Sequence, residues 1–337
     1  MNRKSIIGLS LAFGILSVAA SAQIAAPPGV SQEHLDKAKA IAFGSPGTAY
    51  FPGLLACYGS GDYENNTANP PPTKVFDNLY FVGLGSVGPF ALVTSGGIIL
   101  FDALNDDKEA RDILVPGLKS LGLNPGDIKY VVITHGHGDH YGGAKYLKAT
   151  YGARLLASKE DWAFMAAQKN PSGNGGTPAR WADLVPDHDM DIVDGQKLTL
   201  GNETITFYVT PGHTPGSVST IIPVTDKGVP HVMAFWGGFA VHGGDVATHA
   251  AYNNSITRWE QIVKDAKADG FLNNHPAQGD IGRKLVRARA DKNGSAFVVG
   301  AAELARYLEV LRECNLYNAD VSAATRQNGG ARGRRGQ

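Results

Sequence analysis

The chain has 337 residues, of which 43% are hydrophobic, and its 31 basic residues balance 31 acidic ones. This length is ample for one large hydrophobic core. The formal net charge of zero argues against nucleic acid as the substrate, because phosphate binding requires a basic surface.

The N-terminus has the form of a secretory signal peptide, which we predict over residues 1–22. Two basic residues precede an apolar stretch from Ile6 to Ala20 that is short for a membrane-spanning helix and is interrupted by glycine and serine. The small residues Ala20-Ser21-Ala22 then suit cleavage. We therefore expect a periplasmic or secreted protein that has no membrane contact after cleavage.

Residues 23–73 form a lead-in segment in which 32–41 has helical character. From residue 74, short apolar runs separated by glycine pairs predict an antiparallel meander of strands. Alternating helical and strand patterns follow, namely a helix over 107–122, a strand over 128–135, a helix over 142–152, a strand over 153–158 and a helix over 158–169.

The second half of the chain repeats this order. We predict hairpins over 197–210 and 218–238, a helix over 255–270, a strand end over 271–276 and a last helix over 300–315. The tail, 319–337, is expected to be disordered. Strand groups followed by helices, twice over, predict two β-sheets packed face to face with helices outside, in one domain over 74–318.

Residues 131–143, VVITHGHGDHYGG, place four potential metal ligands directly after an apolar strand: His135, His137, Asp139 and His140. Neutral imidazole and carboxylate suit Zn²⁺, and the alternation of ligand type favours two adjacent ions. The intervening glycines let the backbone close around an ion. The alternative is a histidine-rich surface turn.

This His-x-His-x-Asp-His pattern resembles the signature of the metallo-β-lactamase-fold hydrolase superfamily. TPGHTPGS (210–217) resembles the third motif of that superfamily and supplies His213, and FLNNHPAQ (271–278) resembles the last and supplies His275. ILFDAL (99–104) resembles the first motif, with Asp102 at its strand end. The resemblance spans residues 74–312. It implies an αββα sandwich of two mixed β-sheets flanked by helices, with metals at one edge between the sheets.

The resemblance also implies two zinc ions per chain. The first would be held by His135, His137 and His213, and the second by Asp139, His140 and His275. Three neutral imidazoles leave a fourth position where water can ionise near neutral pH. Asp139 would orient the resulting hydroxide and is the predicted catalytic residue. Asp102 is expected to hydrogen-bond the motif and hold a ligand rotamer, although an ordinary turn residue is the alternative.

In most hydrolases of this superfamily, an aspartate bridges the two metals between the third and last histidine motifs. Here the strand ends in Gly237-Gly238. A missing bridge and a set of five histidines and one aspartate resemble the B3 subclass of metallo-β-lactamases. That subclass usually carries serines after this strand, where this chain has glycine and Phe239, which leaves the lactam substrate open. Asp245 lies at least seven residues beyond the expected place of the bridge.

We therefore predict an exported zinc-dependent hydrolase that opens a β-lactam amide by metal-bound hydroxide, with a small molecule as its substrate. Alternatives are a related hydrolase of a lactone or other ester, a mononuclear iron sulfur-dioxygenase-like enzyme, or a metal-binding protein without turnover. The sequence does not indicate an oligomeric state. The remaining histidines after the motif are expected at the surface: His188, His231, His242 and His249.

The chain has two cysteines, Cys57 and Cys314. In an exported protein such a pair can form one disulfide, which would connect the N-terminal segment to the last helix. The alternative is two separate buried thiols. Neither cysteine lies near a histidine motif, so we expect no thiolate ligand.

Overall fold

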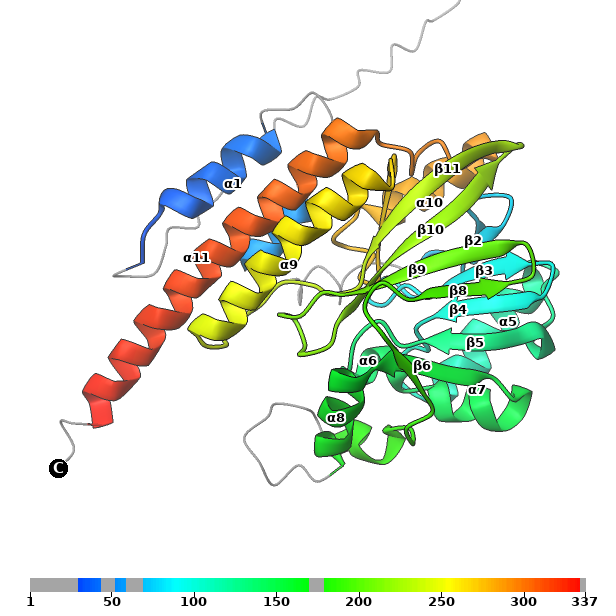
Figure 1. Ribbon diagram of the computed structural model, residues 1–337, viewed down its shortest axis with the longest axis horizontal. Helices are drawn as coiled ribbons and strands as arrows, with labels where there is room; N and C mark the ends of the chain where they lie inside the picture. Colours follow the sequence, from blue (N-terminus) through cyan, green and yellow to red (C-terminus); the bar gives the residue numbers. More distant parts are fainter. Residues whose placement is uncertain (1–29, 44–51, 59–68, 170–178, 334–337) are drawn as a thin grey trace, which may run out of the picture.

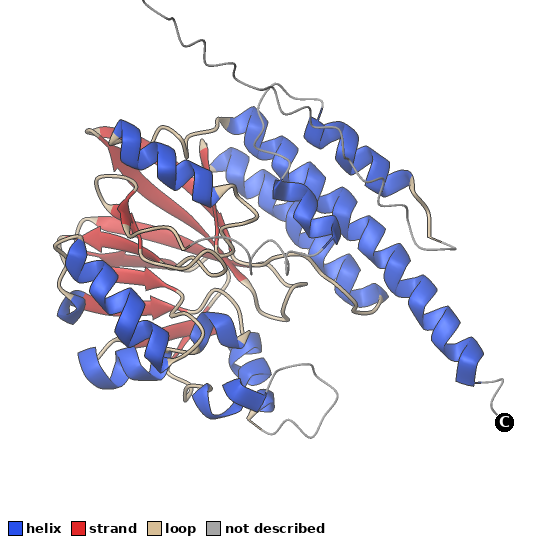
Figure 2. Cartoon of the chain, turned by 180° about the vertical axis from the view of Figure 1, so that it is seen from behind, coloured by secondary structure: helices blue, strands red, loops and turns tan. Residues whose placement is uncertain are grey.

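The computed structural model describes residues 30–43, 52–58, 69–169 and 179–333. Two β-sheets lie face to face, and helices cover the outer face of each sheet (Figures 1 and 2). The αββα sandwich predicted from the sequence is therefore confirmed. The predicted signal peptide lies outside the described residues. In the described part of the chain, no helix combines the length and apolar character needed to cross a membrane.

The first sheet has seven strands that follow one another in chain order. Pairing is antiparallel from β1 to β4 and parallel from β4 to β7. The strands are β1 (Thr73–Lys74), β2 (Leu79–Phe81), β3 (Phe90–Thr94), β4 (Gly97–Phe101), β5 (Ile128–Val132), β6 (Arg154–Ser158) and β7 (Met190–Ile192). The parallel pairs require crossover connections, and helices supply them.

These helices lie on the outer face of the first sheet (Figure 1). They are α4 (Asp107–Glu109), the π-helical η3 (Ala110–Leu114), α5 (Val115–Ser120), the 3₁₀ turn η4 (Pro125–Asp127), α6 (Gly138–Tyr141), α7 (Ala144–Tyr151), α8 (Lys159–Gln168) and the 3₁₀ segment η5 (Ala179–Leu184). Leu118, Leu147 and Met165 are fully buried against Leu100 and Val131, so these helices and the sheet share one apolar layer.

The second sheet has the strand order β12-β11-β10-β9-β8. Its strands are β8 (Lys197–Leu200), β9 (Glu203–Val209), β10 (Val218–Asp226), β11 (Val229–Trp236) and β12 (Gly270–Asn273). The two predicted hairpins are present, with left-handed turn residues at Gly201, Lys227 and Gly228. β12 pairs parallel to β11 after a crossover through α9 (Val246–Asp265), and α10 (Ile281–Asp291) and α11 (Ala301–Gly333) follow.

Aromatic side chains fill the space between the sheets. Phe235 of the second sheet contacts Phe90 and Phe101 of the first edge-to-face, at ring-centroid distances of 6.0 and 5.3 Å. Phe81 extends the row, 5.4 Å from Phe90. Such pairs stabilise by about 0.5–1.5 kcal/mol each beyond the area they bury. They hold the ends of β4 and β11 at a constant separation, and the histidine motifs follow strands at that same edge.

Helices α9, α11 and α1 (Glu33–Phe43) lie side by side beyond the second sheet (Figures 1 and 2). The short η2 (Pro52–Leu54) and α2 (Leu55–Tyr58) also pack on α11. Trp236 of β11 is buried against Tyr252 and Trp259 of α9, at centroid distances of 5.8 and 6.1 Å. The lead-in segment predicted before residue 74 therefore contributes helices to this outer layer.

Two expectations about these helices are wrong, and one helix was missed. α9 begins at Val246 rather than at 255, because the carboxylate of Asp245 accepts a hydrogen bond from the backbone N–H of Thr248 and caps the helix. α10 was not predicted. α11 continues to Gly333, where a disordered tail was expected from 319. Packing carries the helix onward, because Ser322 is buried against the loop that follows β11.

Cys57 and Cys314 form a disulfide, which decides between the two alternatives left by the sequence. The bond connects α2 to α11, and both cysteines are buried. We expect thiol titration of the unfolded, unreduced protein to find no free thiol. Reduction should lower the free energy of unfolding by up to about 4 kcal/mol, because the bond closes a long loop in the unfolded chain. Denaturant titration with and without reductant measures this.

The matched control is the double variant Cys57→Ser with Cys314→Ser, whose stability should not respond to reductant. Two titratable thiols in the unreduced wild-type protein would contradict the bond.

Candidate metal centre

All six predicted ligands come together at one edge of the sandwich. His135 follows β5, and the next three ligands lie at the start of α6. His213 lies in the loop between β9 and β10, and His275 follows β12. The ligand atoms of His135, His137 and His213 lie within 4.8 Å of one another, and so do those of His135, His140 and His275. The structure thus contains two histidine clusters that share His135, and the alternative of a surface turn is wrong because His135 and His140 are fully buried.

The Nε2 atoms of the clustered imidazoles face one another. His213 Nε2 lies 3.1 Å from His135 Nε2, and His140 Nε2 lies 3.2 Å from His275 Nε2. Two nitrogens bound to one tetrahedral zinc at 2.0–2.1 Å are about 3.3 Å apart. Asp139 completes the second cluster, with Oδ2 at 3.3 Å from His140 Nε2 and 4.0 Å from His275 Nε2. The donor set therefore fits a pair of zinc-like ions.

In four of these rings, the other nitrogen, Nδ1, lies within hydrogen-bond distance of an oxygen atom, to which its N–H can donate. The acceptors are Gly237 O for His135 (2.8 Å), Ala240 O for His213 (2.8 Å), Asp102 Oδ2 for His140 (2.7 Å) and Ser86 O for His275 (3.0 Å). With the proton on Nδ1, each Nε2 keeps its lone pair and directs it into the cluster. Metal-binding histidines commonly have this arrangement.

Burial keeps the first cluster neutral. It lowers the pKa of His137 to about 4, and it lowers the pKa values of His135 and His213 well below the ordinary value, with the neighbouring imidazoles adding to the effect. Neutral imidazole is the form that binds a metal, so no proton has to leave these three rings near neutral pH.

Asp102 makes the contacts that the sequence predicted. Its side chain is fully buried at the end of β4. One oxygen accepts a hydrogen bond from Thr134 N–H (2.8 Å), and the other accepts bonds from Thr134 Oγ1 (2.8 Å) and His140 Nδ1 (2.7 Å). The carboxylate therefore anchors the residue before the motif and sets the ring orientation of His140 at the same time.

Asp161 is a buried residue beside the site that sequence reasoning missed. It lies in the first turn of α8, and its buried carboxylate accepts hydrogen bonds from Gly136 N–H (2.8 Å), Thr214 Oγ1 (2.7 Å) and Gly216 N–H (2.8 Å). Burial raises its pKa to about 6, although these three bonds oppose the rise. Asp161 thus connects the loop of the first motif to the loop that carries His213.

The two glycines of the motif are required by packing. A Cβ at Gly136 would lie 2.8 Å from the Phe164 ring, and a Cβ at Gly138 would overlap the Trp181 ring. From the sequence, we expected glycine here because the backbone closes around an ion. The structure gives a different reason, since aromatic side chains occupy the space that a Cβ would need.

Gly237 and Gly238 lie at the metal edge, as expected from the sequence. The carbonyl of Gly237 accepts hydrogen bonds from His135 Nδ1 (2.8 Å) and Asn274 Nδ2 (2.9 Å). A Cβ on Gly238 would lie 2.9 Å from the Cβ of His213, closer than ordinary contact. Asp245 is exposed and caps α9, so it does not replace a bridging carboxylate.

One of the other histidines departs from expectation. His249 is buried, with 3% of its surface exposed, because α11 continues over it. His188 forms an exposed pair with Asp191, and His231 pairs with Asp269 in a half-buried position. His242 is exposed, as expected.

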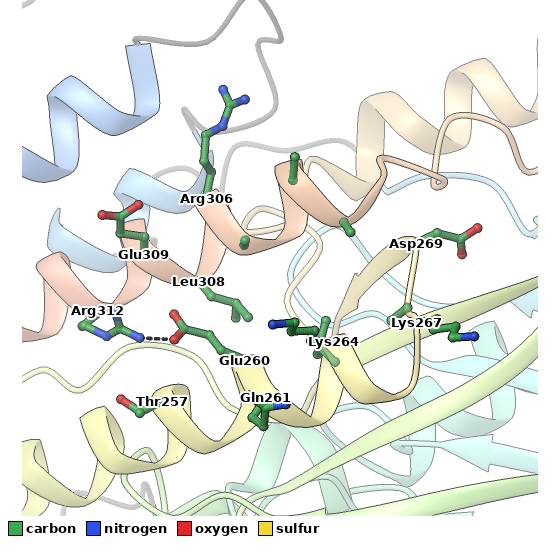
Figure 3. A pocket seen from close by; sticks show the side chains of 15 residues that line it. Thr257, Glu260, Gln261, Lys264, Lys267, Asp269, Arg306, Leu308, Glu309 and Arg312 are labelled. Carbon is green, nitrogen blue, oxygen red and sulfur yellow. Dashed lines mark ion pairs between the residues drawn. The ribbon is translucent and has the colours of Figure 1, made fainter.

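A groove of about 950 Å³ lies elsewhere, between α9 and α11 (Figure 3). Basic and acidic side chains line it, among them Lys264 and Lys267, and the ion pair of Glu260 with Arg312 crosses it. None of its lining residues is one of the six clustered ligands. The groove therefore lies apart from the candidate metal centre.

Known proteins resemble this chain in sequence and in fold. The family profile described as "Metallo-beta-lactamase superfamily" matches residues 83–227. A hydroxyacylglutathione hydrolase of Anaeromyxobacter dehalogenans is 28% identical over 221 residues, which cover 65% of this chain and 70% of the relative. Further relatives of the same description match over less than half of their own length.

Solved structures show the same fold. The FEZ-1 metallo-β-lactamase of Legionella gormanii is 23% identical and has a TM-score of 0.65, with 76% of this chain and 98% of that chain covered. A metallo-β-lactamase of Cronobacter sakazakii with a HARLDQ motif is 27% identical and has a TM-score of 0.60, with 80% and 98% covered. The family profile, the similar solved structures and the curated relatives together show that this chain belongs to the metallo-β-lactamase superfamily of metallo-hydrolases.

Proposed function

We propose that the protein is an exported, zinc-dependent hydrolase that opens the amide of a β-lactam. The observation that carries the proposal is the composition of the site, which has five imidazoles and one carboxylate. At the place where a bridging aspartate would stand, Gly238 leaves no room for a side chain beside His213. Export rests on the N-terminal sequence, which has the form of a signal peptide.

The proposed ligands divide as the sequence predicted. His135, His137 and His213 would hold one zinc, and Asp139, His140 and His275 would hold the other. Zinc, when bound, lowers the pKa of a coordinated water to near neutral and polarises the substrate carbonyl. Burial raises the pKa of Asp139, but without an ion the cationic His140, whose own pKa is raised to about 10, lowers it further than burial raises it, and a bound zinc would take over that role. The ionised carboxylate of Asp139 can accept a hydrogen bond from the attacking water and pass the proton toward the leaving nitrogen.

Two aromatic rings flank the clusters. Phe164 lies 5.9 Å from the His137 ring, and Phe239 lies 5.6 Å from the His275 ring. They can contact the apolar part of a small substrate and exclude bulk water from the reacting carbonyl.

A thioester or other ester, including a lactone, is the second candidate substrate class. The relative described as a hydroxyacylglutathione hydrolase favours it. The zinc-loaded protein should be assayed with a panel of β-lactams, lactones and acyl-thioesters at equal concentrations. We expect the highest kcat/KM for a β-lactam. Turnover of thioesters alone would replace the proposal with the second candidate, and one iron per chain in place of two zinc ions would favour oxidation.

His137→Ala should lower zinc content and reduce kcat/KM by more than about 100-fold. Removing a residue that hydrogen-bonds a metal ligand typically lowers metal affinity or activity by roughly 10–100-fold, and here the ligand itself is removed. His188→Ala, at an exposed histidine outside the clusters, is the control and should retain both zinc and turnover. Full zinc occupancy with unchanged turnover in His137→Ala would show that this ring is not a ligand.

Gly238→Ala should weaken zinc binding at the cluster that contains His213, by about 10-fold, because the added methyl displaces that side chain. Gly238→Asp faces the same contact, so the new carboxylate should not tighten zinc. Gly282→Ala is the matched control, since a Cβ there meets no atom within 4 Å. Stepwise chelation with zinc measurement tests all three variants, and tighter zinc in Gly238→Asp would be the contrary result.

A further inference from the structure

The loop from Gly237 to Asp245 connects the end of β11 to α9 and touches the metal centre twice. Gly237 O and Ala240 O accept the Nδ1–H bonds of His135 and His213, two of the three proposed ligands of the first zinc. Residues 238–244 form no helix or strand and, among the described residues, make no backbone-to-backbone hydrogen bond. Side chains from other elements must therefore hold this loop in place.

The far end of the loop is held by α9 and α11. Gly243 O accepts hydrogen bonds from His249 Nε2 (2.7 Å) and Ser322 Oγ (2.9 Å). Gly244 O accepts a bond from the Arg326 guanidinium. Both glycines have positive φ, 84° and 76°, a conformation in which other residues are strained. The turn thus presents two successive carbonyls to donors from outside the loop.

His249 connects the loop to both helices. The residue is buried, with 3% of its surface exposed. Its Nε2 contacts Gly243 O, and its Nδ1 lies 2.8 Å from Asn315 Oδ1. Asn315 is itself oriented, because its Nδ2 donates to the backbone carbonyl of His249 (2.9 Å). The neighbouring Cys314 anchors α11 to α2 through the disulfide. The ring of His249 is therefore held against α11 next to that anchor, and Ser322 and Arg326 follow further along the same helix.

The two proposed zinc sites differ in their dependence on this loop. His135 and His213 take their acceptors from it. His140 and His275 take theirs from Asp102 and from Ser86 O, which lie in the first sheet and its β2–β3 connection. A change in the position of the loop should therefore affect the first site selectively.

We propose that His249, Ser322 and Arg326 are positioning residues for the first metal site. They hold Gly243 and Gly244 and so fix the carbonyls at 237 and 240 that orient two imidazoles. The proposal rests on the metal centre described above. Because Phe239 lies in the same loop beside His275, these residues also place one wall of the substrate pocket.

The test is the double variant Ser322→Ala with Arg326→Gln in the full-length protein. In the metal-free state, amide hydrogen exchange over 238–245 should become at least about 10-fold faster, because the buried residues 238–241 open to solvent once the loop loses two of its donors. Zinc affinity is then measured with one site retained. In a His275→Ala background, which keeps the three-imidazole site, affinity should fall by about 3- to 10-fold. In a His137→Ala background, which keeps the second site, affinity should not change.

Glu260→Gln is the matched control. It breaks the ion pair with Arg312 that joins the same two helices away from the loop (Figure 3), and it should alter neither the exchange over 238–245 nor zinc affinity. With the two sites separated, a loss confined to the three-imidazole site supports positioning. Equal losses at both sites, or an equal loss in Glu260→Gln, would show general loosening of the fold and overturn it.

Unchanged exchange over 238–245 would also overturn the proposal, whatever the zinc affinities. Because exchange is measured without metal, it decides whether α11 holds the loop even if the wild-type protein binds no zinc, a result that would refute the proposed function instead. In turnover assays of the double variant we expect KM to rise more than kcat falls, as Phe239 moves with the loop.

Discussion

The site depends on which nitrogen of each imidazole faces the cluster. A histidine presents Nε2 to a metal only while an acceptor holds its Nδ1–H, and four rings are held in this way. The acceptors come from distant parts of the chain. Asp102 and Ser86 belong to the first sheet and its connections, whereas Gly237 and Ala240 follow a strand of the second. The two sheets must therefore meet accurately at this edge, and the row of aromatic rings around Phe235 holds them together.

Two buried carboxylates make the motif loop rigid before any ion binds. Burial of an isolated carboxylate is costly, and both Asp102 and Asp161 offset that cost with three hydrogen bonds each. Asp102 holds the loop from the end of β4, and Asp161 holds it from α8. A loop fixed on both sides loses little conformational freedom when a metal is bound, so more of the binding free energy remains for affinity.

The sequence predicted the parts of this site that are local. Four short motifs were sufficient to predict the sandwich and the cluster. They are the strand followed by closely spaced ligands, the strand end with Asp102, and the two later histidine motifs. What it missed depends on contacts between distant segments. Asp161 looks like any acid in the first turn of a helix, and its bonds to Gly136 and Gly216 appear only after folding. Likewise, nothing near His249 in sequence indicates that α11 extends over it and buries it.

The glycine pair after β11 does more than remove a bridging carboxylate. A Cβ at Gly237 would overlap the carbonyl of Val218, so the missing side chain is what lets β11 approach β10 closely enough for Gly237 O to reach His135. The same backbone thus supplies an acceptor and withholds an anionic ligand. An ion surrounded by three neutral imidazoles keeps its full double charge, whereas a bridging carboxylate would offset part of it. Stronger polarisation matters most for an amide, which is less reactive than a thioester, and this is a physical reason for the amide substrate proposed above.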